Sequence, residues 1–146
     1  MKERVGILNN IQLLGNMWFS EIKPVTFESK NTDERLKEFY RYIGCEWVEI
    51  AHIQIDGTRY LMYFDEEGKI KGPWHPTYPL RGQDGEIYDV VAGSVLVVKE
   101  DENENILSLT EQEQSAIRAH LAAEMMAARK KVDEILAERR AKACLN

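Results

Sequence analysis

The C-terminal segment constrains the fold of this chain more than any other part, because no glycine or proline occurs between Glu111 and Asn146. Thr110 with Glu113, or Ser108 with Glu111 in the alternative register, has the spacing of a capping box that begins a helix. Thirty helical residues span about 45 Å, which is longer than a domain of 146 residues is wide. We therefore expect a long C-terminal helix, of which only a part can pack on its own domain.

The apolar pattern within this helix predicts contact with another chain. Apolar residues recur at alternating intervals of four and three, which is the seam of a short coiled coil. The first half of the helix fits packing on its own domain, whereas the second half has little of that domain left to cover. We therefore expect a homo-oligomer, at least a dimer, whose interface residues are Leu121, Met125, Ala128, Val132 and Ile135.

A shorter helix is predicted over residues 32–43, between a capping residue and a stop signal. Asn31 can accept hydrogen bonds from the first turn of this helix, and Gly44 supplies the left-handed conformation that ends it. Four apolar residues fall on one face, at i, i+3, i+4 and i+7: Leu36, Phe39, Tyr40 and Ile43. We expect this face to pack on a sheet.

The first half of the chain also has the pattern of strands. Residues 1–20 predict short strands or a hairpin, and residues 22–27 predict a strand that Pro24 confines to a sheet edge. Residues 46–64 predict two strands joined by Asp56-Gly57, a dipeptide that favours a tight hairpin turn.

The pattern of the whole chain defines a fold class. Residues 72–85, rich in proline and glycine, predict a loop, and residues 90–98 are almost continuously apolar, as in a central strand covered on both faces. The predicted fold is α+β: an antiparallel sheet with one short packed helix and a long C-terminal helix. We divide the chain into a core domain at residues 1–110 and the long helix at residues 111–146, whose expected role is oligomerisation.

Charge and composition exclude several functional classes. The 25 acidic and 19 basic residues leave a net charge of −6, which argues against direct contact with nucleic acid. No apolar run approaches the roughly 20 residues that a membrane span needs, and no signal-type segment follows the first residues. Cys45 and Cys144 lack the CxxC spacing, so we expect free thiols in a reducing compartment. The sequence predicts a cytoplasmic protein that does not bind a membrane.

The residues that catalysis needs do not form a motif. His52, His75 and His120 make no HxH or HxxxH pair, so we expect no metal site. Ser94 lacks the GxSxG elbow, and the chain has no glycine-rich phosphate loop. We therefore expect a protein that is not an enzyme, with no catalytic residue and no cofactor. A small hydrolase whose site is assembled in space is the third-ranked alternative.

The predicted loop at residues 72–85 carries the best candidates for ligand contact. Trp74, His75 and Tyr78 can stack on a planar ring, and the Arg81 guanidinium can hold a phosphate or carboxylate in a fork. Prolines in the loop stiffen it and so lower the entropy lost on binding. The alternative is that Trp74 and Tyr78 close one side of the core, and that the prolines only bound an irregular crossover.

An acidic surface offers a second route to a partner. Residues 1–110 carry a net charge of −7, most densely at residues 100–104, whereas residues 111–146 carry +1. Some proteins imitate DNA with rows of carboxylates and so occupy nucleases. The alternative function is therefore an acidic, protein-binding inhibitor of the DNA-mimic type.

Residues 43–111 resemble a known family. The residues that carry the likeness are Ile43-Gly44, Trp47-Val48-Glu49-Ile50, Tyr63-Phe64-Asp65-Glu66-Glu67-Gly68-Lys69-Ile70, Asp89-Val90-Val91-Ala92-Gly93 and Leu107-Ser108-Leu109-Thr110. The family is a small domain of unknown function from phages, plasmids and other mobile elements, mainly of Firmicutes, and the likeness covers about residues 22–111. Its members usually carry an asparagine-containing, proline-bounded stretch where this chain has Trp74-His75-Pro76-Thr77.

The resemblance implies a setting and, through it, a function. Accessory proteins of this size in mobile elements often antagonise host defence, by sequestering a nucleotide signal or by occupying a defence protein. We therefore expect a non-catalytic binding protein of a phage or mobile element, located in the host cytoplasm if phage-encoded. Its expected partners are a second copy of itself and either a small anionic nucleotide or a host defence protein.

Overall fold

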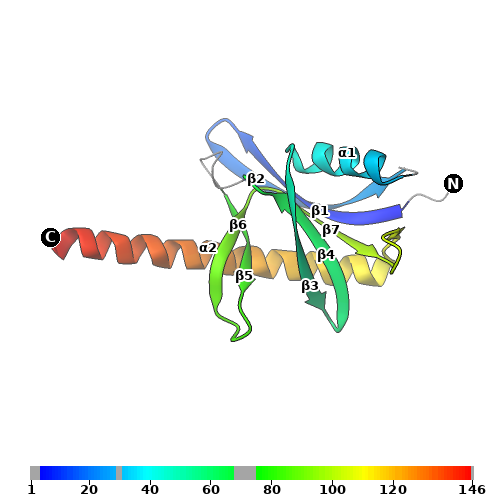
Figure 1. Cartoon of the computed structure of the whole chain (residues 1–146). Coiled ribbons are helices and arrows are strands. Elements are labelled where there is room, and N and C mark those ends of the chain that lie inside the picture. Colours follow the sequence, from blue (N-terminus) through cyan, green and yellow to red (C-terminus); the bar gives the residue numbers. More distant parts are fainter. Residues whose placement is uncertain (1–3, 29–30, 68–74, 146) are drawn as a thin grey trace.

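The computed structural model describes residues 4–28, 31–67 and 75–145, which form two antiparallel sheets and two helices (Figure 1). The helices are α1 (Thr32–Ile43) and α2 (Glu111–Leu145). The strands are β1 (Arg4–Leu14), β2 (Met17–Phe27), β3 (Val48–Ile55), β4 (Thr58–Asp65), β5 (Pro76–Arg81), β6 (Ile87–Ala92), β7 (Val95–Glu100) and β8 (Ile106–Leu107). The predicted α+β class, with one short helix and a long C-terminal helix, is confirmed.

The larger sheet has the strand order β2-β1-β7-β4-β3, and β8 adds to it by pairing with β7. Strand β7 is central and buried on both faces. Val95 and Val97 pack in the core cluster on the side of α2, whereas Leu96 and Val98 pack in the cluster on the side of α1. The prediction of one strand over residues 90–98 is wrong in one respect. Gly93 has a φ of 89° and interrupts the strand, so residues 90–92 belong to β6 and residues 95–98 belong to β7.

Helix α1 begins and ends where the sequence predicts. The Asn31 side chain accepts a hydrogen bond from the backbone N–H of Glu34 at 2.9 Å, and Gly44 ends the helix at a φ of 79°. On the buried face, the Phe39 ring lies 4.5 Å from the Tyr63 ring, measured between centroids. This packing fixes α1 on one face of the larger sheet.

Two hairpins form the outer parts of the larger sheet. The β3–β4 turn has Asp56 at a φ of 51° and Gly57 at 82°, which is the tight turn that this dipeptide predicts. The β1–β2 hairpin confirms the hairpin predicted for the start of the chain, and β2 is an edge strand, as Pro24 predicts. The larger sheet therefore ends in β2 on one side and β3 on the other.

The far end of the β1–β2 hairpin is apolar and carries no charge. We call residues 10–20 the uncharged ribbon. Strand β1 pairs with β7 only over Ile7–Asn9, so beyond Asn9 it pairs with β2 alone. The exposed large side chains of the ribbon, on both of its faces, are Leu13, Leu14, Met17, Trp18 and Phe19.

The prediction of an irregular loop over residues 72–85 is wrong for residues 76–81 and holds for the turn at residues 82–85. Strand β5 occupies Pro76–Arg81 and pairs with β6 in a separate two-stranded sheet. Prolines are compatible with this strand because it is an edge strand and needs ladder hydrogen bonds on one side only. Residues 72–74 of the predicted loop lie outside the described residues.

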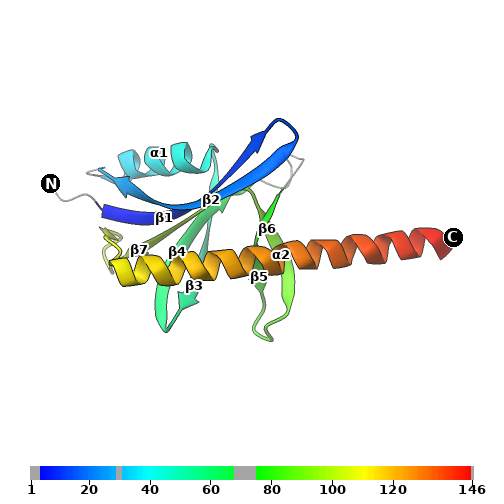
Figure 2. The same cartoon turned by 180° about the vertical axis from the view of Figure 1, so that it is seen from behind.

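Helix α2 crosses the opposite face of the larger sheet from α1 and then continues past both sheets (Figure 2). Its N-terminus is a capping box: Thr110 N–H donates to Glu113 Oε1 and Glu113 N–H donates to Thr110 Oγ1, both at 3.1 Å. Ile117 and Leu121 are fully buried in the core, whereas the end of the helix projects. Among the described residues, no helix has the length and apolarity required to cross a membrane.

Candidate functional site

A cleft of about 550 Å³ lies between β3, the β5–β6 hairpin and α2, and we call it the β3–β5 cleft. Its walls include residues 49–54 of β3, residues 78–81 of β5, Tyr88 of β6, and His120 and Glu124 of α2. Because β3 and β5 are edge strands of two different sheets, the cleft opens where the two sheets meet over α2. Its volume is in the range of small-molecule sites.

Tyr78 belongs to the core, as the alternative prediction has it, and it also lines the cleft, where its contact with a ligand stays a prediction. Its hydroxyl lies 2.7 Å from His120 Nε2, and the two ring centroids are 5.7 Å apart. Burial, with the nearby Glu124 carboxylate, raises the pKa of Tyr78. Burial also lowers the pKa of His120. Both rings are therefore neutral at pH 7.

Arg81 reaches the same cleft from the end of β5. Its Nη2 lies 3.2 Å from Glu124 Oε1, and the two side chains are 38% and 18% exposed. A partly exposed pair of this kind contributes little to stability, but it holds the guanidinium at the cleft wall. Glu124 lies one helical turn after His120, so one face of α2 carries both polar groups.

His75 lies apart from Tyr78 and Arg81 and does not line the β3–β5 cleft. Its Nε2 is 2.8 Å from Arg129 Nη2, and its ring packs edge-on against Trp18 of the uncharged ribbon, with centroids 5.5 Å apart. Burial and the Arg129 charge lower the pKa of His75. Trp74, the fourth predicted ligand residue, lies outside the described residues.

The five residues of the predicted helical seam divide into two groups. Leu121 and Ala128 are fully buried within the chain's own structure. The Met125 sulfur lies 3.5 Å from Nδ2 of the buried Asn9, which also ties it to the same chain. Val132 and Ile135 remain partly exposed. Val132 and Ile135, at the C-terminal end of the seam, therefore leave surface that a partner chain can contact.

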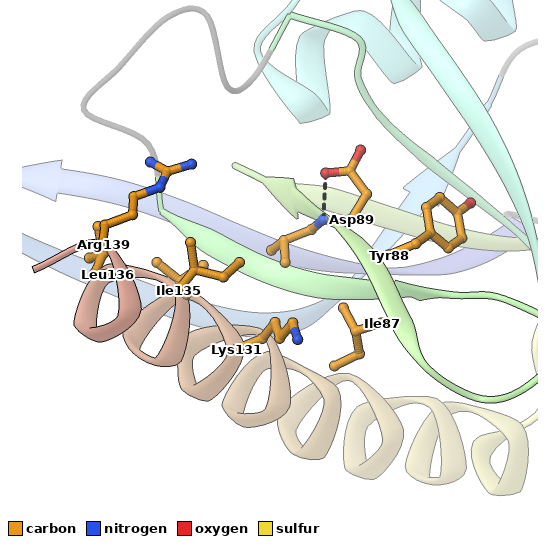
Figure 3. Close-up of a pocket in the computed structure, with 9 residues that line it drawn as sticks. Ile87, Tyr88, Asp89, Lys131, Ile135, Leu136 and Arg139 are labelled. Carbon is orange, nitrogen blue, oxygen red and sulfur yellow. Dashed lines mark hydrogen bonds between the residues drawn. The ribbon is translucent and has the colours of Figure 1, made fainter. Parts of the chain in front are cut away.

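Val132 and Ile135 line a second, mostly apolar space between β6 and α2, which we call the β6–α2 groove (Figure 3). The groove has a volume of about 260 Å³. Its walls also include Ile87, Tyr88 and Leu136. Figure 3 shows Ile87 pointing from the strand toward the helix, whereas the Tyr88 ring points away from the helix. Tyr88 thus borders both the groove and the cleft.

The acidic segment predicted as a partner surface forms the turn between β7 and β8. The Asp101 carboxylate accepts hydrogen bonds from the backbone N–H groups of Asn103 and Asn105, at 2.8 and 2.9 Å. Such bonds lower the pKa of Asp101. Within the described ranges, histidine, cysteine and acidic side chains do not cluster in groups of three that could hold a metal ion.

Apart from Tyr78 and Arg81, sequence reasoning missed the residues of the cleft, among them Tyr88, His120 and Glu124. The spacing of His120 and Glu124 does place them on one helix face, but only the fold brings β5 beside that face. Tyr88 follows the turn after β5, and it becomes a cleft residue only because β5 and β6 form a hairpin.

Comparison with known proteins gives one match. The sequence profile of a family described as a domain of unknown function (DUF3846) matches residues 19–122. No curated protein and no solved structure matches the chain significantly.

Proposed function

Because the chain belongs to the DUF3846 family, a domain of unknown function, we propose a function from the chain's own surface: a non-catalytic binding protein that holds a small, anionic, ring-bearing molecule in the β3–β5 cleft. The observation that carries this proposal is the combination of one cation and one exposed ring on the same hairpin. Arg81 and Tyr88 both line the cleft, and Tyr88 is 71% exposed.

The chemistry of the lining fits a nucleotide. The Arg81 guanidinium has five N–H donors, and its bond to Glu124 at 3.2 Å leaves a side of the fork for phosphate oxygens. The exposed face of Tyr88 can stack on a base. Across the cleft, the Glu49 carboxylate can accept hydrogen bonds from an amino group of that base.

Glu124 has a positioning role in this proposal. It holds the guanidinium in place before the ligand arrives, so less side-chain entropy is lost on binding. It also opposes binding of a purely anionic ligand, since its own charge repels phosphate. The pair therefore favours a molecule that carries an amino-substituted ring as well as a negative group.

We further propose the biological setting implied by the resemblance to mobile-element proteins. In a phage or plasmid, a protein that binds a nucleotide without converting it removes that molecule from a host defence pathway. The setting supplies a reason for a binding protein without catalytic activity. The acidic, protein-binding inhibitor is the competing proposal, and it needs no ligand in the cleft.

The experiment that tests the proposal combines two measurements on the full chain. Small molecules released from the heat-denatured protein are identified by mass spectrometry, and a panel of linear and cyclic mononucleotides is screened for a rise in melting temperature. We expect at least one nucleotide to raise the melting temperature. Arg81→Ala should weaken its binding at least tenfold, and Tyr88→Ala should weaken it by about 1–3 kcal/mol, as for stacked bases elsewhere.

Matched variants separate binding from folding. Tyr88→Phe keeps the ring and should keep most of the affinity, and Arg118→Ala removes an exposed cation of α2 that does not line the cleft. Trp74→Ala tests its two predicted roles, since a ligand contact affects affinity alone, whereas a core residue affects stability. If no nucleotide shifts the melting temperature and no ligand is released, the proposal is wrong and the acidic inhibitor is favoured.

A further inference from the structure

We propose that the β6–α2 groove is occupied by α2 of a second copy of this chain, with the two helices antiparallel and related by a two-fold axis near residues 133 and 134. The groove shares Tyr88 with the β3–β5 cleft but is otherwise a separate surface, so the pairing of two chains does not depend on the proposed ligand. The groove lies between the projecting helix and β6, and apolar side chains line both of its walls (Figure 3).

The apolar side chains of the groove are only partly covered within one chain, as expected for one side of a protein–protein interface. Val132 and Ile135 are only partly buried by β6, and Leu136 and Tyr88 are exposed by 40% and 71%. Of the earlier seam residues, Leu121 and Ala128 are buried within the chain and Met125 is half-buried beside Asn9, so they leave less surface for a partner. A second helix would therefore pair with α2 at Val132 and Ile135, beside β6, where the apolar side chains are only partly covered.

Charge complementarity identifies the occupant and its direction. In an antiparallel pair, Val132 of one chain forms a layer with Ile135 of the partner subunit. The flanking positions on one side of this layer are Lys131 and Glu138. Lys131 then faces Glu138 of the partner subunit, and the two-fold axis repeats the same pair in the opposite sense. The sequence is therefore complementary to itself across this axis.

Neither charge is used elsewhere in the described part of the chain. Lys131 and Glu138 form no ion pair there, and seven residues of helix separate them by about 10 Å, too far for contact with each other. A parallel pair would instead place Lys131 against Leu136 of the partner subunit, where the charge has no complement. The charge pattern thus favours the antiparallel arrangement.

The test is a charge exchange on the full chain, read as mass by light scattering at high micromolar concentration. We expect the wild type at twice the chain mass of 16.9 kDa. Lys131→Glu and Glu138→Lys each create two like-charge pairs, so each should raise the dimer dissociation constant at least tenfold. The double variant restores opposite charges and should restore the dimer. Lys130→Glu, the same charge change on the far side of the helix, should leave the mass unchanged.

Each other outcome overturns the proposal. A wild type that remains at the mass of a single chain shows that the groove does not hold a second copy. A dimer that both single variants leave intact forms through another surface. If the single variants dissociate and the double variant does not form the dimer again, the antiparallel pairing is excluded. Because both positions are on the helix surface, none of these variants is expected to unfold the protein, and circular dichroism checks this.

Discussion

The Tyr78 hydroxyl lies 2.7 Å from Nε2 of His120, and this contact joins β5 to α2 between two residues that line the β3–β5 cleft. Burial raises the pKa of the phenol and lowers the pKa of the imidazole. Both groups are therefore neutral at pH 7, and one hydrogen bond joins them, in which the tautomer of the imidazole sets which group donates. Protonation of the imidazole would place a charge in a partly buried site.

The first prediction is a loss of stability in weak acid. The folded pKa values of His120 and His75 lie below the ordinary value of 6.5, so below that pH the unfolded chain binds more protons than the folded chain. The free energy of unfolding is thus highest above pH 6.5 and falls as the pH is lowered, by at most about 1.4 kcal/mol per histidine for each pH unit. Urea unfolding at pH 7.5 and 5.5 measures this difference.

His120→Gln should reduce this pH dependence, because glutamine keeps an acceptor for Tyr78 and does not titrate. His52→Gln is the matched control, since His52 is exposed on β3. If His120→Gln leaves the pH dependence of stability unchanged, protonation of His120 does not cause the loss of stability in weak acid.

The second prediction concerns the start of α2. Burial raises the pKa of Glu113, but bonds from Thr110, Lys99 and Tyr60 outweigh it and lower the net value. Thr110→Ala should cost about 1 kcal/mol of stability, as for other capping residues. Glu113→Ala should cost about 1–3 kcal/mol, because it also leaves the Lys99 and Tyr60 groups without their 3.0 Å bonds.

Urea unfolding at pH 7 measures both changes. Gln112→Ala is the control, since this side chain is exposed in the same turn and should change stability by less than about 0.5 kcal/mol. Equal losses in Gln112→Ala and Glu113→Ala would mean that the capping box does not stabilise the fold.

The third prediction concerns the uncharged ribbon. Leu14 and Met17 are 58% and 65% exposed, so serine at both positions removes little buried surface. We expect the melting temperature to change by no more than a few degrees, while binding of a hydrophobic fluorescent dye falls. Ile7→Ala, in the buried part of the same strand, should cost about 2–5 kcal/mol. A double serine variant as unstable as Ile7→Ala would show that the ribbon is packed in solution.

The sequence predicted those elements whose signals are local. The Asn31 cap, the Gly44 stop, the Asp56-Gly57 turn and the Thr110–Glu113 box each depend on residues a few positions apart, and each is present as predicted. β5 was missed because proline is unfavourable in an average strand, and only its position at an edge makes it compatible.

The candidate site was predicted only in part for a related reason. Arg81 and Tyr78 were named from a loop with the right residue types, and the fold brings both to the cleft. The other residues of the cleft come from β3, β6 and α2, and no spacing along the sequence indicates that these elements lie beside β5. The helical seam stays a prediction as an interface, because periodicity cannot tell whether a residue such as Leu121 faces its own sheet or another chain, and Leu121 is buried in its own chain.

Tyr88 is the side chain that borders both the cleft and the groove. Because the same residue lines both spaces, we expect a ligand stacked on its ring and a helix packed against it to affect each other. If assembly changes ligand affinity by some factor, thermodynamic reciprocity requires that the ligand change assembly by the same factor. Through this one phenol, the proposed pairing of two chains would respond to the concentration of a small molecule.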